Sequence, residues 1–237
     1  MKLRKTKNFV DLKIDYVIKL GGSLIANIDE AQNLAKTLIK ISENNRIVIF
    51  PGGGPIDNLI EKIDKQFTLN EITHHQACAR AQDQTGLIFA NFNLDFFETT
   101  DNFSGIRDIL DRGKIPVLLP SKLIFMLDPF EKSWSISSDS MGAYFSFLLE
   151  AKKFLILTDV DGIYNKDPNQ NIDSKLLSRI SVKSLNSLGH TSVDETLSSF
   201  LLNAEMCCWV LNGYNYNNLI DFFNQKDNAI CTEISYN

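Results

Sequence analysis

Short apolar runs alternate along this chain with longer stretches in which apolar residues recur at helical spacing. Residues 16–20 are apolar apart from one lysine, as in a buried strand, whereas residues 29–41 carry their alanine, leucine and isoleucine residues with the 3.6-residue period of a helix. Residues 46–50 again have the pattern of a strand, so these segments predict a βαβ unit. The same patterns predict helices at residues 56–63, 72–92, 106–112 and 139–151 and around 219–223, and strands at 115–120, 154–158, 207–211 and 229–234.

The predicted fold class is α/β. Strands separated by helices of this length favour a mainly parallel central sheet with helices on both faces, which makes three αβα layers. With 237 residues, of which 44% are hydrophobic, the chain can bury a sizeable core. The sequence has no internal repeat, low-complexity tract or linker, so we expect a single domain over residues 1–237.

The overall charge and hydropathy argue against two classes of partner. A formal net charge of −5 and a pI near 5.3 disfavour nucleic acid, because a phosphate backbone requires surplus lysine and arginine on one face. The basic N-terminal stretch lacks the apolar run of a signal peptide, and no later segment has about 18 uncharged apolar residues, so no membrane contact is expected. We therefore expect a soluble, cytoplasmic protein.

The cysteines and histidines do not predict a metal site. Cys78, Cys207, Cys208 and Cys231 lack CxxC spacing, so we expect reduced thiols in the core rather than metal ligands or a disulfide. The adjacent histidines at positions 74 and 75 have no cysteine or carboxylate at ligand spacing, which favours surface or helix-capping roles.

Two glycine-rich turns are the most informative motifs: YVIKLGGS at residues 16–23 and IVIFPGGGP at residues 47–55. Without Cβ atoms, several backbone N–H groups can approach one phosphate, and a helix that begins there adds the positive end of its dipole. Plain tight turns are the alternative. Because both turns follow predicted strands of one sheet, they favour a polyphosphate site at the carboxyl edge of that sheet.

A third feature lies at residues 135–168, where an aspartate opens a helix and the next strand ends in an acidic TDVDG turn. Together with the glycine turns it suggests a phosphotransferase, which must hold two anionic groups in line and neutralise the transferred charge. Lys19, directly before the first glycine turn, suits neutralisation, although a solvent-facing lysine is the alternative. Asp139, taken alone, is most often an N-cap.

These motifs carry a resemblance to a known family. KLGGS, PGGGP, SSDS and TDVDGIYNKDP, in this order and at these distances, resemble the amino acid kinase superfamily, the fold of acetylglutamate kinase, aspartokinase and uridylate kinase, over about residues 14–235. The resemblance implies an ATP-dependent kinase of amino acid kinase-like fold, with an acceptor-binding lobe at about residues 14–127 and a nucleotide-binding lobe at about 128–237. It also implies Mg²⁺ held largely by the phosphates and a closed homo-oligomer.

Four further stretches are similar to one branch, the [5-(aminomethyl)furan-3-yl]methyl phosphate kinases of methanofuran biosynthesis: LLPSK, SWSISSDS, TSVDET and VLNG at residues 118–122, 133–140, 191–196 and 210–213. This branch implies that a furanylmethyl monophosphate is the phosphate acceptor and that its diphosphate is the product. Two other branches fit less well. Isopentenyl phosphate kinases have a histidine shortly after the second glycine turn, where this chain reads PIDN, and an aspartokinase would need a long regulatory extension.

The resemblance implies a role for each motif. Lys19 and Asp139 would be catalytic, with the aspartate orienting the lysine, and Asp159 and Tyr164 would lie near the ribose and base. The residues implied to contact the nucleotide are Gly21, Gly22, Ser23, Thr158, Asp159, Asp161, Gly162, Tyr164, Lys166, Asp167 and Pro168. Direct metal ligation by the acidic turn is an alternative.

The acceptor would lie between the second glycine turn and the following long helix. Gly52, Gly53 and Gly54 would offer backbone amides to the acceptor phosphate and the transferred group. Arg80 would meet the acceptor phosphate and Asp83 its aminomethyl group, since a guanidinium suits phosphate and a carboxylate suits ammonium. The alternative, which the sequence supports equally, is that Arg80 and Asp83 form an exposed charge pair on the helix.

One departure from the family keeps other functions open. Many members carry a second lysine about six residues beyond a threonine that corresponds to Thr196, and Leu202 stands at that position here. Uridylate kinases lack this lysine too, and Lys166 is a candidate substitute. A non-catalytic paralogue that acts as a structural partner, a uridylate kinase-like enzyme and an oxyanion-storage protein therefore remain as alternatives.

Overall fold

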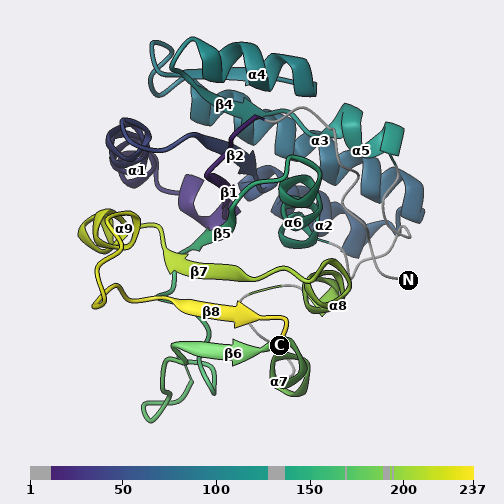
Figure 1. Ribbon diagram of the computed structural model, residues 1–237. Coiled ribbons are helices and arrows are strands. Elements are labelled where there is room, and N and C mark those ends of the chain that lie inside the picture. Colours follow the sequence, from purple (N-terminus) through teal and green to yellow (C-terminus); the bar gives the residue numbers. More distant parts are fainter. Residues whose placement is uncertain (1–11, 128–136, 169, 189–192, 194) are drawn as a thin grey trace.

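The structure is a computed structural model that describes residues 12–127, 137–168, 170–188, 193 and 195–237. Within them, eight strands form one sheet in the order β3–β4–β2–β1–β5–β7–β8–β6 (Figure 1). The first six strands in this order, from β3 through β7, are parallel to one another. Strand β8 is antiparallel to β7 and parallel to β6. The strands are β1 (Tyr16–Leu20), β2 (Ile47–Pro51), β3 (Phe97–Thr100), β4 (Ile115–Leu118), β5 (Lys153–Thr158), β6 (Arg179–Ser181), β7 (Cys208–Asn212) and β8 (Thr232–Ser235).

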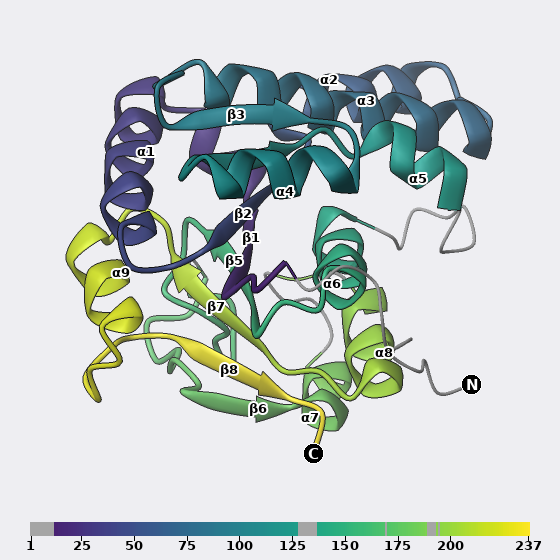
Figure 2. The ribbon, with the colours of Figure 1, turned by 45° about the horizontal axis from the view of Figure 1, so that its top comes forward.

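Helices cover both faces of this sheet, which confirms the predicted three-layer α/β fold. One apolar cluster joins α1, α9 and the end of α3 to one face, and a second joins α4, α6, α7 and α8 to the other (Figure 2). The helices are η1 (Gly22–Ile25), α1 (Ile28–Ser42), α2 (Gly54–Gln66), α3 (Glu71–Ala90), α4 (Phe103–Asp111), α5 (Ser121–Leu127), α6 (Ser138–Leu148), α7 (Val182–Ser187), α8 (Glu195–Ala204) and α9 (Tyr216–Phe223).

The central strand β1 shows why the two faces differ. Side chains alternate across a strand, and Ile18 and Leu20 pack with α1 and α9 whereas Val17 packs in the cluster that contains α6. Burying each of these side chains contributes about 1.5–3 kcal/mol. Lys19 has the same parity as Val17, so the strand directs it toward α6.

Side-chain caps begin most of the long helices, because the first backbone N–H groups of a helix lack partners within it. The side chain of Asn27, for example, accepts hydrogen bonds from the N–H groups of Asp29 and Glu30 at the start of α1. The other capping side chains are those of Asn70, Asn102, Ser137, Ser181 and Asn215.

Six elements escaped the sequence analysis: β3, β6, η1, α5, α7 and α8. The strands β3 and β6 span only four and three residues, and the helices α5 and α7 only seven and six, which is too short for a period to emerge. The last strand was placed too early, since β8 covers Thr232–Ser235 rather than residues 229–234. No helix in the described ranges is long and apolar enough to cross a bilayer.

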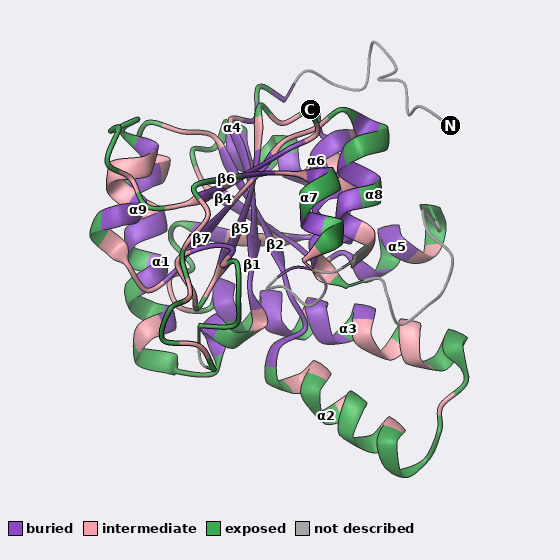
Figure 3. Cartoon of the chain, turned by 90° about the horizontal axis from the view of Figure 1, so that it is seen from below, coloured by how far each residue is buried: buried purple, intermediate pink, exposed green. Residues whose placement is uncertain are grey.

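Helix α2 forms as predicted, but its apolar residues remain largely in solvent. Leu59 and Ile63 are 57% and 45% exposed, and Gly54 is the one residue of this helix that is buried. Figure 3 shows α2 as a mostly exposed arm beside α3. The apolar face of α2 is therefore only partly covered by α3, with Ile56 and Ile60 half-buried and Leu59 and Ile63 exposed.

Candidate active site

The two glycine turns meet at the carboxyl edge of the sheet, where β1 and β2 end side by side. A Cβ atom at Gly22 would lie 2.5 Å from the backbone nitrogen of Gly54 and 2.6 Å from its Cα. Gly54 itself has φ +63°, a conformation that favours glycine. Contact between the two turns therefore requires glycine on both sides.

Two more contacts fix the second turn in place. The hydroxyl of Thr85, on α3, donates a 2.9 Å hydrogen bond to the carbonyl of Gly53, and Thr85 is 1% exposed. A Cβ at Gly52 would lie 3.2 Å from Oγ of Ser138, the first residue of α6. The amino end of α6 therefore lies beside the second turn, where its dipole favours an anion.

Lys19 and Asp139 form a buried ion pair between these elements. The distance from Lys19 Nζ to Asp139 Oδ1 is 2.5 Å, and the two side chains are 10% and 6% exposed. Ser137 rather than Asp139 caps α6, because its side chain accepts from the Asp139 N–H at 3.2 Å. The Asp139 carboxylate is thus available for the lysine, which the N-cap alternative would not have allowed.

A close helix–strand contact brings this pair together. A Cβ at Gly142 would lie 3.1 Å from the ring of Phe154 on β5 and 3.3 Å from Cβ of Lys19 on β1. Glycine at this position lets α6 approach the sheet. The first turn of α6 can therefore place a carboxylate over β1.

The nucleotide loop predicted after β5 lies on the same edge. Thr158 ends β5, and a Cβ at Gly162, where φ is +152°, would lie 2.4 Å from Oγ1 of Thr232. The carboxylate of Asp161 accepts a 3.0 Å hydrogen bond from the side chain of Asn212, at the end of β7. Asp159 is exposed. Burial and the charge of Asp161 raise the pKa of Tyr164.

The remaining nucleotide candidates lie farther along a β-ribbon. Tyr164 pairs with Leu176 in an isolated antiparallel bridge, and Lys166, Asp167 and Pro168 follow as exposed residues. Lys166 pairs with Asp173 at 2.6 Å, with side chains 48% and 72% exposed. In this structure its ammonium is therefore engaged within the ribbon.

The two acceptor candidates on α3 both contact α5. Asp83 accepts from the backbone N–H of Ser121 at 3.0 Å and from the Ser121 hydroxyl, so it caps α5. Arg80 lies over the ring of Phe125, with its Cζ 4.8 Å from the ring centroid. Ser121 of the LLPSK stretch thus links α5 to α3.

Leu202, which stands where many family members have a second lysine, lies away from the glycine turns. It lies in the last turn of α8, is 44% exposed, and precedes β7. Since β7 runs parallel to β1, its start lies at the edge opposite the glycine turns. Residues 133–136, 191, 192 and 194 of two family-like stretches lie outside the described residues.

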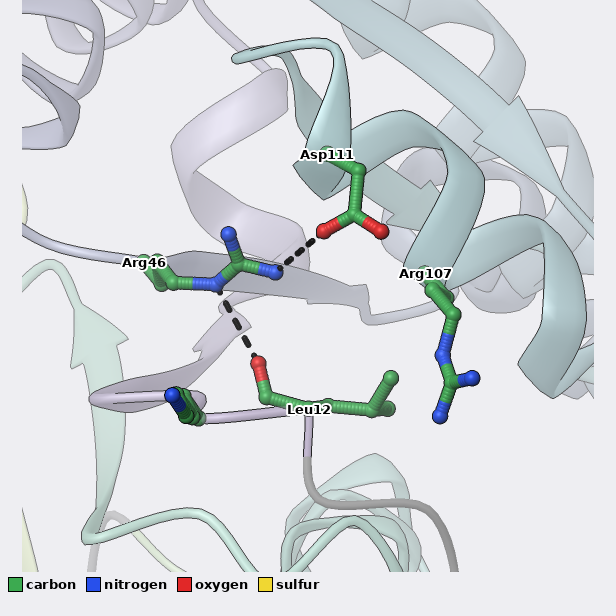
Figure 4. A pocket seen from close by; sticks show the side chains of 5 residues that line it. Leu12, Arg46, Arg107 and Asp111 are labelled. Carbon is green, nitrogen blue, oxygen red and sulfur yellow. Dashed lines mark hydrogen bonds and ion pairs between the residues drawn. The ribbon is translucent and has the colours of Figure 1, made fainter.

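A separate pocket of about 390 Å³ lies at that opposite edge, before β1 and β2. Arg46 spans it, donating to the carbonyl of Leu12 at 3.1 Å and to Asp111 at 3.0 Å, while Arg107 lines the far side (Figure 4). Its position separates it from the glycine turns.

The described side chains offer no metal cluster: none of their groups of three or more histidine, cysteine, aspartate or glutamate residues suits an ion. All four cysteines are free, as predicted, but the expectation of core thiols is correct only for Cys208, since the other three are half-buried. Burial, with a further contribution from the charge of Asp139, raises the pKa of the Cys208 thiol.

Sequence analysis missed several residues that support the site. Thr85 and Tyr214 carried no local signal, because each acts through a contact distant in sequence. Ser121 did carry one, since it belongs to the LLPSK stretch, and so did Asn212, since it belongs to the VLNG stretch.

Comparisons with known proteins agree with this geometry. The Amino acid kinase family model matches residues 16–212. Over 213 residues the chain is 34% identical to a [5-(aminomethyl)furan-3-yl]methyl phosphate kinase of Methanocaldococcus jannaschii, covering 90% of this chain and 94% of that protein. It is 23% identical over 246 residues to a uridylate kinase of Thermococcus kodakarensis, covering 92% and 98%. The solved uridylate kinase of Archaeoglobus fulgidus shares the fold, with a TM-score of 0.73, 17% identity and coverage of 94% and 100%.

Proposed function

Because the chain belongs to the amino acid kinase family and is thus a phosphotransferase, we propose that it transfers the γ-phosphoryl group of ATP to [5-(aminomethyl)furan-3-yl]methyl phosphate, giving the diphosphate for methanofuran-type biosynthesis. The observation that carries the proposal is the buried Lys19–Asp139 pair beside two glycine turns in mutual contact. Such a site fits the needs of phosphoryl transfer, which are alignment of two phosphates and neutralisation of charge.

The proposed roles follow the layout of the edge. Lys19 neutralises the transferred group, and Asp139 orients Lys19. Gly21, Gly22 and Ser23 hold the phosphates of ATP through backbone amides, and Gly52–Gly54 hold the acceptor phosphate. No base is required, because an acceptor phosphate is already largely ionised at neutral pH.

On the nucleotide-binding lobe, residues 158–168 are proposed to hold ribose and base, chiefly through Asp159 and Tyr164. Mg²⁺ would neutralise phosphate charge. The donor set fits an ion held mainly by phosphates, since the described residues offer no three-ligand cluster. Of the carboxylates on this loop, Asp161 is already hydrogen-bonded to Asn212.

The proposed acceptor-binding lobe comprises residues 14–127. Within it, Arg80 remains the proposed contact for the acceptor phosphate and Asp83 that for the acceptor ammonium. This assignment requires Asp83 to share its carboxylate between the substrate and Ser121, which it already caps. It also requires the Arg80 guanidinium to act from its place over Phe125.

We also propose a cytoplasmic homo-oligomer. The support for the oligomer is a set of exposed apolar side chains on α2, which includes Leu59 and Ile63. Large exposed apolar patches mark interfaces. Light scattering after size exclusion tests this, and Leu59→Glu should shift the mass toward the monomer.

The test of the function is ATP consumption with Mg²⁺ and a panel of phosphate monoesters that includes the furan phosphate and uridine monophosphate. We expect turnover with the furan phosphate and a loss of about 10²–10³-fold in kcat for Lys19→Ala. Lys152→Ala is the matched control, because this 72% exposed lysine pairs with Asp15 at the opposite edge of the sheet.

Each other outcome favours a different function. Turnover with uridine monophosphate alone would favour the uridylate kinase-like reading, for which the similarity over 92% of the chain is the supporting observation. Absence of turnover from a folded protein with every acceptor would favour the non-catalytic paralogue.

A further inference from the structure

The turn that follows β7, residues 212–214, touches both halves of the proposed nucleotide site. It includes the end of the VLNG stretch, for which the proposed chemistry has no role. Three segments distant in sequence converge on it: the first glycine turn, the end of β5 and the acidic nucleotide loop.

On the loop side, Asn212 uses both ends of its carboxamide. Its Nδ2 donates to Asp161 Oδ1 at 3.0 Å, and its Oδ1 accepts from the Tyr214 N–H at 2.9 Å. The next residue, Gly213, donates its N–H to the carbonyl of Thr158 at 2.8 Å. Only a side chain with a donor and an acceptor can make both Asn212 contacts.

On the glycine-turn side, the hydroxyl of Tyr214 donates to the carbonyl of Ser23 at 3.1 Å. A Cβ at Gly213 would lie 2.5 Å from Cδ1 of Leu24, so the two turns are in close contact. Burial, together with the charges of Asp159 and Glu30, raises the pKa of Tyr214.

We propose that Asn212 and Tyr214 are positioning residues that hold the first glycine turn and the nucleotide loop at a fixed separation and thereby set the affinity for ATP. The inference rests on the proposed function, because the ligand that spans these two segments is a nucleoside triphosphate. If the two segments moved independently, ATP would have to order them on binding, and this entropic cost would weaken its affinity.

The test compares two neighbouring tyrosines. Tyr214→Phe removes the hydrogen bond to the carbonyl of Ser23 in the glycine turn, whereas Tyr216→Phe removes a hydroxyl that donates to the carbonyl and the carboxylate of Glu30 on α1 and makes no bond to that turn. We expect Tyr214→Phe to raise KM and Kd for Mg-ATP about 3- to 10-fold, in line with the loss of one hydrogen bond. The acceptor KM should not change, kcat should stay within about twofold, and Tyr216→Phe should leave KM for ATP unchanged.

A charge swap tests Asn212. Asn212→Asp keeps the acceptor for the Tyr214 N–H but places a carboxylate against Asp161, so KM for ATP should rise by about 10-fold or more. The double variant Asn212→Asp/Asp161→Asn restores a donor and acceptor pair. Its KM for ATP should return to that of Asp161→Asn alone, the reference that accounts for any contact of Asp161 with the nucleotide.

Several results would overturn the inference: equal KM values for ATP in the two tyrosine variants, a parallel rise in both substrates' KM with a lower Tm, or no recovery in the double variant. If the wild-type protein does not bind Mg-ATP, the proposed function fails instead. The positioning role is then tested by hydrogen–deuterium exchange of residues 21–25, which should be faster in Tyr214→Phe than in Tyr216→Phe, and equal rates would refute it.

Discussion

The Lys19–Asp139 pair should show strong energetic coupling in the absence of any substrate. The two charges are 2.5 Å apart with side chains 10% and 6% exposed, so removal of one partner leaves the other buried and uncompensated. Breaking a buried pair in this way costs about 3–5 kcal/mol, whereas replacing both partners costs much less. We therefore expect Lys19→Met and Asp139→Asn each to lose about 3–5 kcal/mol of unfolding free energy.

The double variant is the informative measurement. Lys19→Met/Asp139→Asn should lose at least about 2 kcal/mol less than the sum of the single variants. Urea denaturation of the ligand-free protein, followed by tryptophan fluorescence, measures each free energy at constant m-value. The matched control is the cycle of Lys166→Met and Asp173→Asn, whose pair has a similar 2.6 Å distance but side chains 48% and 72% exposed.

The control cycle should give a coupling below about 1 kcal/mol, because solvent screens exposed charges. Additivity of the Lys19 and Asp139 variants to within about 0.5 kcal/mol would refute the reasoning. It would mean that the two charges are independently solvated, and the role of Asp139 in orienting Lys19 would lose its physical basis.

Two further predictions concern the glycine turns. Gly22→Ala would place a Cβ 2.5 Å from the backbone of Gly54 and should weaken Mg-ATP binding by more than 10-fold in calorimetry. The control is Gly113→Ala, at a φ of +72° where a Cβ would have nothing within 4 Å. This variant should cost only about 1–2 kcal/mol of stability and leave Mg-ATP binding intact. Equal binding by both variants would contradict the close contact. Thr85→Val leaves the carbonyl of Gly53 without its hydrogen-bond donor. The variant should lose about 1–3 kcal/mol of unfolding free energy in urea denaturation and should have a higher KM for the acceptor. An unchanged acceptor KM would mean that Thr85 does not support the acceptor site.

Local pattern was enough to predict most of the long elements, although it missed the ten-residue helix α8. Helices such as α1 and strands such as β1 and β5 carry their period within their own residues, so their positions agree with the sequence analysis to within a few residues. The apolar face of α2 was predicted by the same period, but its exposure was not, because a period says which residues share a face and nothing about what covers it.

The sequence by itself determined the fold class and the identity of the motifs at the site. Lys19 and the glycine turns were found by residue type and spacing, because close backbone approach needs glycine and phosphate needs a cation. The role of Asp139 came only from the resemblance to the family, since its local pattern favoured an N-cap. Their assembly was decided by tertiary structure. The ion pair between Lys19 and Asp139, and the bonds from Asn212 and Tyr214, join residues up to 191 positions apart. No local pattern encodes such contacts, because they depend on parallel strands ending at one edge of the sheet.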